Sequence, residues 1–337
     1  MEMNKNENKI GGRIAYVDAL KCIGILLVIK GHVDLFGFGV DSYDCMSSQL
    51  AYAFNMPIFF FISGYFAYKE IMPSNKILEG IRNKFVYLVL PAVFFSIYMN
   101  IVKERQLLGF IYKGFGIYWF TITLFYCFLL YYITRLFFGS RKCLCGILAL
   151  ISVIGVAYLS LGNKYEIPLL DLNHLSKYFQ YFSFGIIAKM FNDKYVALIT
   201  NKSLISIVTI LLFCLLAIVC HCTTEIPSIV IRPLRDMVLR YAGTFIMLSI
   251  FFRTNDFFCK NNWLNKVILK IGRYSLPMYL LQYFFLPEFP QIENLDMFTI
   301  NMISIMYTFL IVAVCMLFIA IISNSDFARK YILGQRK

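Results

Sequence analysis

Apolar runs long enough to cross a lipid bilayer dominate this sequence and constrain its fold more than any other feature. Of its 337 residues, 60% are hydrophobic and 15% are charged, whereas soluble domains average about 25% charged residues. A helix needs about 20 mainly apolar residues to span the hydrocarbon core. We therefore expect an all-α polytopic membrane protein with about ten transmembrane helices, at residues 14–35, 50–68, 85–102, 117–138, 144–162, 174–190, 203–221, 237–252, 266–287 and 300–323.

The basic residues between these runs predict an orientation in the membrane. Counted from the N-terminus, and with the basic residues near the adjoining run ends included, lysine and arginine number 20 in the odd-numbered connecting segments and 8 in the even-numbered ones. Because cytoplasmic segments carry the excess of basic residues, both termini, residues 1–13 and 324–337, are expected in the cytoplasm. This bias accounts for the net charge of +13 without a nucleic-acid partner.

The chain is expected to form one transmembrane domain over residues 1–337. Its basic start and first apolar run are similar to a secretory signal, but no small-residue cleavage site follows His32, which favours a retained anchor. The ten cysteines include no pair of pairs at metal-ligand spacing, so no metal site is expected. Any chemistry must therefore involve the helices and the short segments between them.

The first run carries a stripe of ionisable residues. At 100° per residue, the 11 positions from Lys21 to His32 bring these residues to within about 20° of one helix face, and Asp18 joins them within about 40°. Lys30 points elsewhere and is expected to extend toward an interface. A charged group near the bilayer centre costs about 2.5–3.5 kcal/mol on insertion scales, so such residues usually face a bundle interior or a wet cavity.

This stripe has two interpretations. A neutral imidazole at His32 can take a proton from a hydroxyl, while Lys21, deeper on the same face, offers positive charge or hydrogen bonds. Alternatively, Asp18 and Lys21 neutralise each other as an i,i+3 pair, and His32 is an interfacial histidine. The first interpretation suggests two reactants that enter from opposite sides of the membrane.

Six segments of the sequence occur in the same order as the motifs of a known family. The first, RIAYVDALKCIGILLVIKGH (13–32), places ten residues between a basic residue and a histidine near the end of the first helix. Together with the later segments it resembles the membrane acyltransferase family 3, whose members move acyl groups onto cell-surface sugars. The later segments are FNMPIFFFISGYF (54–66), KFVYLVLP (84–91), YWF (118–120), FSFG (182–185) and IGRYSLPMYLLQ (271–282).

The sequence departs from the family pattern at three positions. Tyr87 stands where the second basic residue of a pair is usual, and Asn55 and Gln282 stand where many members carry histidine. Asn and Gln form hydrogen bonds but cannot accept a proton at neutral pH. The resemblance therefore implies that His32 is the catalytic base, with Lys21 and Asp18 beside it on the same face.

The resemblance also implies an acyl donor, typically acetyl-CoA, that enters from the cytoplasm. Arg82, Lys84 and Arg273 lie in or beside expected cytoplasmic segments and are candidates to bind its phosphates, Arg by a planar fork and Lys as a point charge. The alternative is that these residues anchor helix ends at the inner leaflet. The donor is expected as a co-substrate, with no metal.

On the outer side, Arg232, Arg235 and Arg240 gather around the start of the eighth run. They are candidates to bind the acceptor, which the resemblance implies is a carbohydrate or a lipid-linked oligosaccharide. Asn55 is a further candidate contact to this substrate. The alternative is a structural ion pair between Asp236 and Arg240, four residues apart.

The resulting expectation is a multi-pass O-acetyltransferase of the bacterial cytoplasmic membrane. A proton-coupled transporter also fits intramembrane Asp, Lys and His, but no paired repeat of polar broken helices is visible. A non-catalytic subunit of polysaccharide assembly is a third possibility, against which the Lys21 to His32 pattern argues. The acceptor sugar, the acyl group and the oligomeric state stay open.

The chemistry of transfer also stays open in two respects. His32 either assists direct attack by the hydroxyl or takes the acyl group itself before passing it on. A donor of hydrogen bonds to the developing oxyanion is required. The sequence does not choose that donor among Lys21, Asn55, Ser63 and Tyr279.

Overall fold

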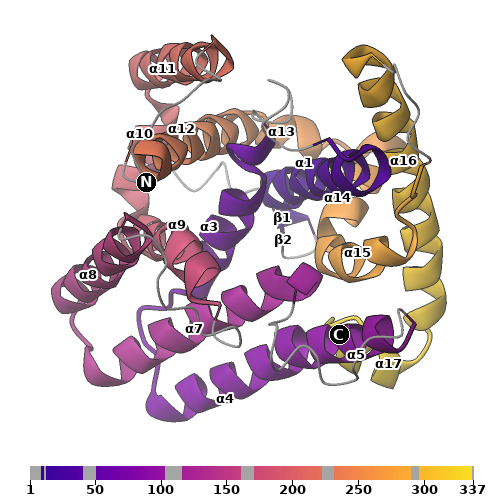
Figure 1. Cartoon of the computed structure of the whole chain (residues 1–337). Helices are drawn as coiled ribbons and strands as arrows, with labels where there is room; N and C mark the ends of the chain where they lie inside the picture. Colours follow the sequence, from indigo (N-terminus) through magenta and orange to yellow (C-terminus); the bar gives the residue numbers. More distant parts are fainter. Residues whose placement is uncertain are drawn as a thin grey trace. The chain divides into compact units, whose positions relative to one another are not determined.

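The described chain is almost entirely helical (Figure 1). The expected cytoplasmic ends, residues 1–13 and 324–337, lie partly outside the described residues. Side chains are not described for residues 9–10, 160, 216–221 and 231–234. The computed structural model describes residues 9–10, 13–40, 51–102, 116–160, 171–221, 231–289 and 296–335.

The helices follow one another with few other elements between them. A two-residue hairpin, β1 (Lys9–Ile10) and β2 (Arg13–Ile14), pairs antiparallel before the first helix. The helices of the first half are α1 (Ala15–His32), η2 (Val33–Gly37, a π-helix), α3 (Asn55–Ala67), α4 (Ser74–Lys84), η3 (Phe85–Val89, a π-helix), α5 (Leu90–Val102), η4 (Gly116–Tyr118), α7 (Trp119–Phe137) and α8 (Arg141–Ser160). Those of the second half are α9 (Leu172–Met190), α10 (Asn192–Thr200), α11 (Lys202–His221), α12 (Ile231–Arg253), α13 (Asn255–Phe258), α14 (Trp263–Arg273), α15 (Ser275–Leu281), η5 (Gln282–Phe284), α16 (Met297–Ile322) and α17 (Asp326–Tyr331).

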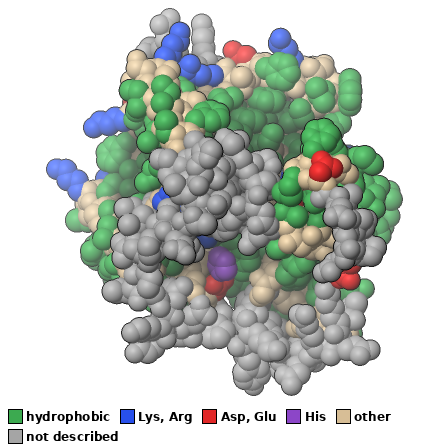
Figure 2. All heavy atoms as spheres, turned by 45° about the horizontal axis from the view of Figure 1, so that its top comes forward, with side chains coloured by type: hydrophobic (Ala, Val, Ile, Leu, Met, Phe, Trp, Pro, Cys, Tyr) green, Lys and Arg blue, Asp and Glu red, His purple; other side chains and the backbone are tan. Residues whose placement is uncertain are grey.

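Several helices have the length and apolar composition of membrane spans. Large apolar side chains such as Val153, Ile210 and Phe309 are exposed on them, and Figure 2 shows hydrophobic side chains over much of the visible described surface. The bent pair α10 and α11, with 67° between its halves, gives one further span if it crosses as a unit. The chain is thus an all-α multi-pass membrane protein. The four single spans are Ser74–Ile101, Gly116–Phe137, Arg141–Leu159 and Met297–Ile322.

The other expected runs are helical too, but they are shorter, broken or more polar than a simple span. Helix α1 carries three charged residues, and α3 has only 13 residues. Helix α12 contains several arginines, and α9 begins with polar residues. The run at 266–287 divides into α14, α15 and η5, with the break at Tyr274. Helices of this kind need polar or close-packed partners, because lipid cannot satisfy their charges.

One helix begins earlier than the sequence predicts. The run expected at 85–102 starts instead at Ser74, because α4, η3 and α5 form one continuous stretch. Segment α4 alternates charged residues with apolar ones, and its Ile77 is buried. A search for apolar runs misses such an amphipathic helix, although a search for the helical period of 3.6 residues detects it.

The chain divides into two compact units. The first comprises Met1–Phe59, Asp193–Pro227 and Leu234–Ala320, and the second comprises Phe60–Asn192, Ser228–Pro233 and Ile321–Lys337.

In the first unit, α1 packs along α14 and also contacts α13 and α15 (Figure 1). The crossing with α14 is very close, because a Cβ built on Gly272 would lie 1.7 Å from the carbonyl oxygen of Asp18. The start of α1 has no capping side chain of its own. Instead, the buried Asn255 of α13 accepts the backbone N–H of Tyr16 at 3.1 Å. The first helix is therefore fixed by residues about 240 positions away.

In the second unit, α9 packs against α7 and α8 (Figure 1). Two glycines permit an equally close crossing with the part of α3 in this unit. A Cβ on Gly64 would lie 1.9 Å from the carbonyl oxygen of Phe182, and one on Gly185 would lie 2.1 Å from that of Phe61. The glycines of the FISGYF and FSFG segments thus serve packing, as small residues do in membrane helix pairs.

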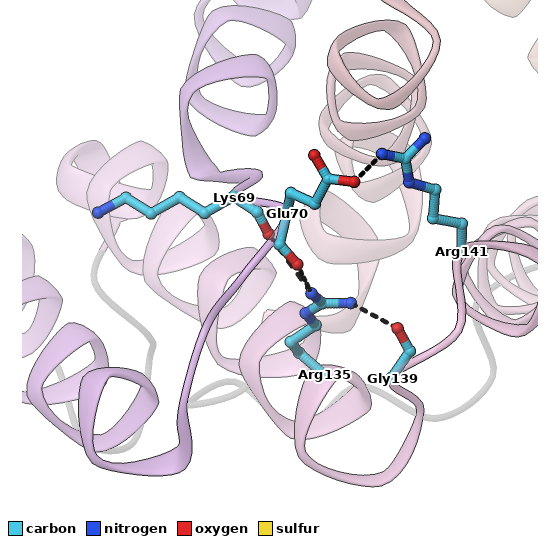
Figure 3. A network of polar contacts seen from close by, with 5 residues as sticks. All are labelled: Lys69, Glu70, Arg135, Gly139 and Arg141. Atoms are coloured by element: carbon cyan, nitrogen blue, oxygen red, sulfur yellow. Dashed lines mark hydrogen bonds and ion pairs between the residues drawn. The ribbon is translucent and has the colours of Figure 1, made fainter.

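A polar network joins the end of α7 to the segment after α3 (Figure 3). The Arg135 guanidinium donates to the backbone carbonyls of Gly139 at 3.0 Å and of Lys69 and Glu70. Arg141, at the start of α8, forms an ion pair with the Glu70 carboxylate. Because these groups are exposed, their contribution to stability is small. Their main effect is to hold these two loops together.

Candidate active site around His32

His32 ends α1 and lies against the segment that follows α15. Its Nδ1 is 3.1 Å from the Oε1 of Gln282, a fully buried side chain at the start of η5. The imidazole ring also packs near Tyr283, with 5.0 Å between ring centroids, and near Phe36, with 6.0 Å. An amide and aromatic rings therefore surround the histidine within the first unit.

The hydrogen bonds of Gln282 determine the tautomer of His32. The Nε2 amide of Gln282 donates to the carbonyl oxygen of Tyr279 at 3.1 Å, so the Oε1 must face His32. A flipped amide would place two acceptor oxygens together. Since Oε1 can only accept, Nδ1 carries the proton in the neutral imidazole, and the lone pair is on Nε2.

The Nε2 atom of His32 faces a hydroxyl group. The Tyr283 hydroxyl oxygen lies 3.3 Å from it, which is at the long end of a hydrogen bond. With the lone pair on Nε2, Tyr283 is the donor. The geometry thus presents a nitrogen base to an O–H group, the arrangement that general base catalysis requires.

Asp18 and Lys21 lie on the same helix as His32, nearer its N-terminal end. The buried Asp18 carboxylate is 3.6 Å from the Lys21 ammonium and 3.7 Å from the Arg13 guanidinium. The ion pair that the alternative interpretation predicted is therefore present. Along the helix axis, Lys21 and His32 are about 16 Å apart, so Lys21 does not contact the imidazole.

Lys30 does not extend to an interface, contrary to the expectation from its helix phase. Its ammonium is 2.6 Å from a carboxylate oxygen of Asp34 in η2, and both side chains are largely buried. The physical reason is pairing, because a buried carboxylate one turn away stabilises the charge better than a partial path to water does. The i,i+4 spacing was visible in the sequence.

The candidates for the donor's phosphates lie in different units. Arg82 and Lys84 end α4 in the second unit, and the Lys84 ammonium lies 3.6 Å above the Phe128 ring. Arg273 ends α14 in the first unit. Among the described residues, Arg82 and Arg273 have no ion-pair partner, and both are exposed. Each is therefore available to bind an anion.

One of the outer candidates, Arg235, is held in an ion pair. Arg235 donates to the carboxylate of its neighbour Asp236 at 2.8 Å and 3.0 Å. Arg240 lies one turn further along α12, and the side chain of Arg232 is outside the described residues. The amide oxygen of Asn55 accepts the backbone N–H of Met56 at 2.6 Å.

The sequence motifs did not identify the two partners of His32 as such. Gln282 was noted only as a departure from a family position, and Tyr283 follows the last matched residue. Of the possible oxyanion donors, Tyr279 is buried beside Tyr283, with 6.0 Å between ring centroids, whereas Ser63 belongs to the second unit. Within the described residues, no group of three His, Cys, Asp or Glu side chains has the geometry of a metal site.

Comparison with known proteins adds one finding. A sequence model of a family described as an acyltransferase domain matches residues 14–324. The matched range contains His32, Gln282 and every later segment of the resemblance. No curated protein and no solved structure matches the chain.

Proposed function

The chain belongs to the membrane acyltransferase family 3, as its sequence motifs indicated, and we propose that it is an O-acetyltransferase that uses cytoplasmic acetyl-CoA to acetylate a hydroxyl of an extracytoplasmic sugar. The acceptor is a cell-surface polysaccharide or a lipid-linked oligosaccharide. The enzyme would work in the bacterial cytoplasmic membrane.

The environment of His32 is the observation that carries this proposal. Gln282 holds the proton on Nδ1, and the remaining nitrogen faces the hydroxyl of Tyr283. A sugar hydroxyl placed where the tyrosine hydroxyl lies would donate to the same lone pair. This arrangement supports a proton-accepting role for His32 better than it supports an interfacial histidine.

The reaction then follows from the chemistry of a thioester. As the sugar oxygen attacks the carbonyl carbon, the hydroxyl proton passes to Nε2 of His32. When the carbon–sulfur bond breaks, the imidazolium returns this proton to the sulfur, so that the products are an ester and a free thiol. Because a sugar hydroxyl is a very weak acid, proton transfer accompanies the attack.

The acidic donor has cationic side chains available to it. Arg82 and Arg273 are exposed and without carboxylate partners in the described part of the chain, and guanidinium groups bind phosphate by a planar fork. Lys21, which shares the buried Asp18 carboxylate with Arg13, supplies charge inside the membrane rather than at the reacting hydroxyl.

Contacts between connecting segments support ten crossings with both termini in the cytoplasm. On the expected inner side, Arg141 forms an ion pair with Glu70, and the Arg253 guanidinium donates to the Thr200 carbonyl. On the expected outer side, the Phe38 ring packs on Phe289 at 4.7 Å. Each contact joins two odd-numbered or two even-numbered segments. A chain that alternates sides at every run produces this pattern.

The test of the proposal uses the purified full-length protein in lipid nanodiscs. We expect acetyl-CoA hydrolysis or acetyl transfer that is lost in His32→Gln, while binding of CoA is retained. A general base typically contributes about 100- to 10,000-fold, equivalent to roughly 3–5 kcal/mol of transition-state stabilisation. Turnover by His32→Gln within a few-fold of the parent would contradict the assignment of the base.

Two further measurements address the acceptor and the orientation. Mass spectrometry of surface glycans from cells with and without the protein should show acetylation that depends on it. A reporter that works only in the cytoplasm should be active when it is fused after Lys337. Absence of that activity would overturn the topology.

A further inference from the structure

The second unit contains an aromatic cluster that the proposed reaction does not use. Trp119 begins α7, and His174 and Tyr178 lie one turn apart on α9. The Trp119 ring stacks on the His174 ring, with 4.0 Å between centroids and 16° between planes, and on the Tyr178 ring at 5.2 Å and 23°. The sequence motifs matched Trp119 to the YWF segment but gave it no function.

The two rings from α9 lie on the same face of the indole. His174 and Tyr178 are nearly parallel to each other, at 7°, and their centroids are 6.3 Å apart. Rings on opposite faces would be separated by two stacking distances, which is about 7 Å at van der Waals contact. Among the described residues, Phe120 contacts Trp119 only edge-on, so no ring stacks on its second face.

A carboxylate orients the histidine of this cluster. Asp171 caps α9, and its two oxygens lie 2.7 Å and 2.8 Å from the Nδ1 of His174. Its backbone has a φ of 44°, in the left-handed region that few residues other than glycine adopt. The His174 Nδ1–H therefore donates to Asp171, and within the described residues Nε2 has no partner. The His174 side chain is 37% exposed.

These groups have the chemistry of a sugar-binding site. A planar indole face packs against the apolar C–H face of a pyranose ring. A fixed imidazole nitrogen and a carboxylate beside it supply directional hydrogen bonds to hydroxyl groups, the few polar contacts that orient a ligand. Tryptophans that only anchor a helix at the membrane interface need no oriented histidine–carboxylate pair.

We propose that Trp119, His174 and Asp171 form a subsite for one pyranose ring of the carbohydrate acceptor. The assignment rests on the proposed function, because the loop charges place the starts of α7 and α9 on the outer side. In this assignment the three residues bind and orient the acceptor, and His32 stays the proposed base.

The chain offers a direct optical test, because it contains only two tryptophans. The second, Trp263, is 76% exposed on α14, so Trp263→Phe leaves Trp119 as the single emitter. Full-length Trp263→Phe protein in nanodiscs would be titrated with the methyl β-pyranosides of glucose, galactose and N-acetylglucosamine. Sorbitol, which carries similar hydroxyls without a ring, is the matched control.

We expect a saturable change in Trp119 emission with at least one pyranoside and none with sorbitol. His174→Ala and Asp171→Asn, each in the Trp263→Phe background, should weaken the apparent affinity at least tenfold. The asparagine variant keeps the size of the capping side chain, so it separates loss of orientation from loss of folding. No response to any pyranoside, an equal response to sorbitol, or unchanged affinity in both variants would overturn the proposal.

Acetyl-CoA hydrolysis by the same Trp263→Phe preparation separates the two proposals. Hydrolysis without pyranoside binding would overturn the subsite and leave the acetyltransferase assignment standing. Pyranoside binding without hydrolysis would overturn the acetyltransferase assignment and leave a carbohydrate-binding membrane protein.

Discussion

Replacing Gln282 should slow the reaction without changing the binding of the donor. Gln282→Met keeps the length of the side chain but removes the acceptor of the Nδ1–H bond at 3.1 Å and the donor to the Tyr279 carbonyl. His32 would then sample both tautomers and a wider range of ring orientations. Only the tautomer with its lone pair on Nε2 faces the hydroxyl side.

The size of the effect can be bounded from the structure. One lost hydrogen bond of this kind is worth about 0.5–1.5 kcal/mol, and a buried group left unpaired costs about 1–3 kcal/mol. We therefore expect kcat to fall about 10- to 100-fold, which corresponds to roughly 1.4–2.7 kcal/mol. Because Gln282 acts through His32, its loss cannot cost more than the loss of His32 itself.

Steady-state acetyl transfer on purified variants provides the assay. The KM for acetyl-CoA should stay within about threefold in Gln282→Met. The change affects the proposed base and not the side chains proposed to bind the phosphates of the donor. Gln282→Glu retains an oxygen acceptor for Nδ1 and should recover part of kcat. A kcat in Gln282→Met within twofold of the parent would refute the assignment of the tautomer to Gln282.

Two further predictions concern stability. Gly272→Ala should lower the thermal unfolding midpoint by several degrees, because a Cβ there meets the Asp18 carbonyl oxygen at 1.7 Å. The control Gly146→Ala should not lower the midpoint, because nothing lies within 4 Å of the added Cβ. Equal midpoints for the two variants would contradict the close crossing. Lys30→Met should cost about 3–5 kcal/mol of unfolding free energy because it leaves the buried Asp34 unpaired. Adding Asp34→Leu should recover most of that loss in a double-mutant cycle, and additive losses would show that the pair is not coupled.

The apolar runs predicted where most helices lie, because the requirement for about 20 apolar residues is strict in lipid. Prediction was poorer where a helix is amphipathic or broken. The start of α4 at Ser74 was missed, and the division of 266–287 at Tyr274 was not expected. In both places the local hydropathy is mixed, and tertiary packing determines the helix boundary.

The candidate site was predictable only along a single helix. Helical periodicity places Asp18, Lys21 and His32 on one face, because it needs only local geometry. The bond from Asn255 to Tyr16 joins residues 239 positions apart, and that from Gln282 to His32 joins residues 250 apart. No local pattern specifies such pairs. The pairing of Lys30 with Asp34 is different, since its i,i+4 spacing is a local pattern that the sequence contains.

The IGRYSLPMYLLQ segment fixes the direction as well as the chemistry of the site. Near its start, Gly272 touches the Asp18 carbonyl, and at its end Gln282 bonds to His32. Because Asp18 precedes His32 in α1, the segment must run parallel to α1. In the proposed topology both segments cross the bilayer, and two parallel spans require an odd number of crossings between them. The seven apolar runs between the first and the ninth satisfy this requirement. Which end of the segment lies beside the proposed base therefore depends on the number of crossings. In a chain with one crossing fewer between these helices, the opposite end of the segment would lie beside His32.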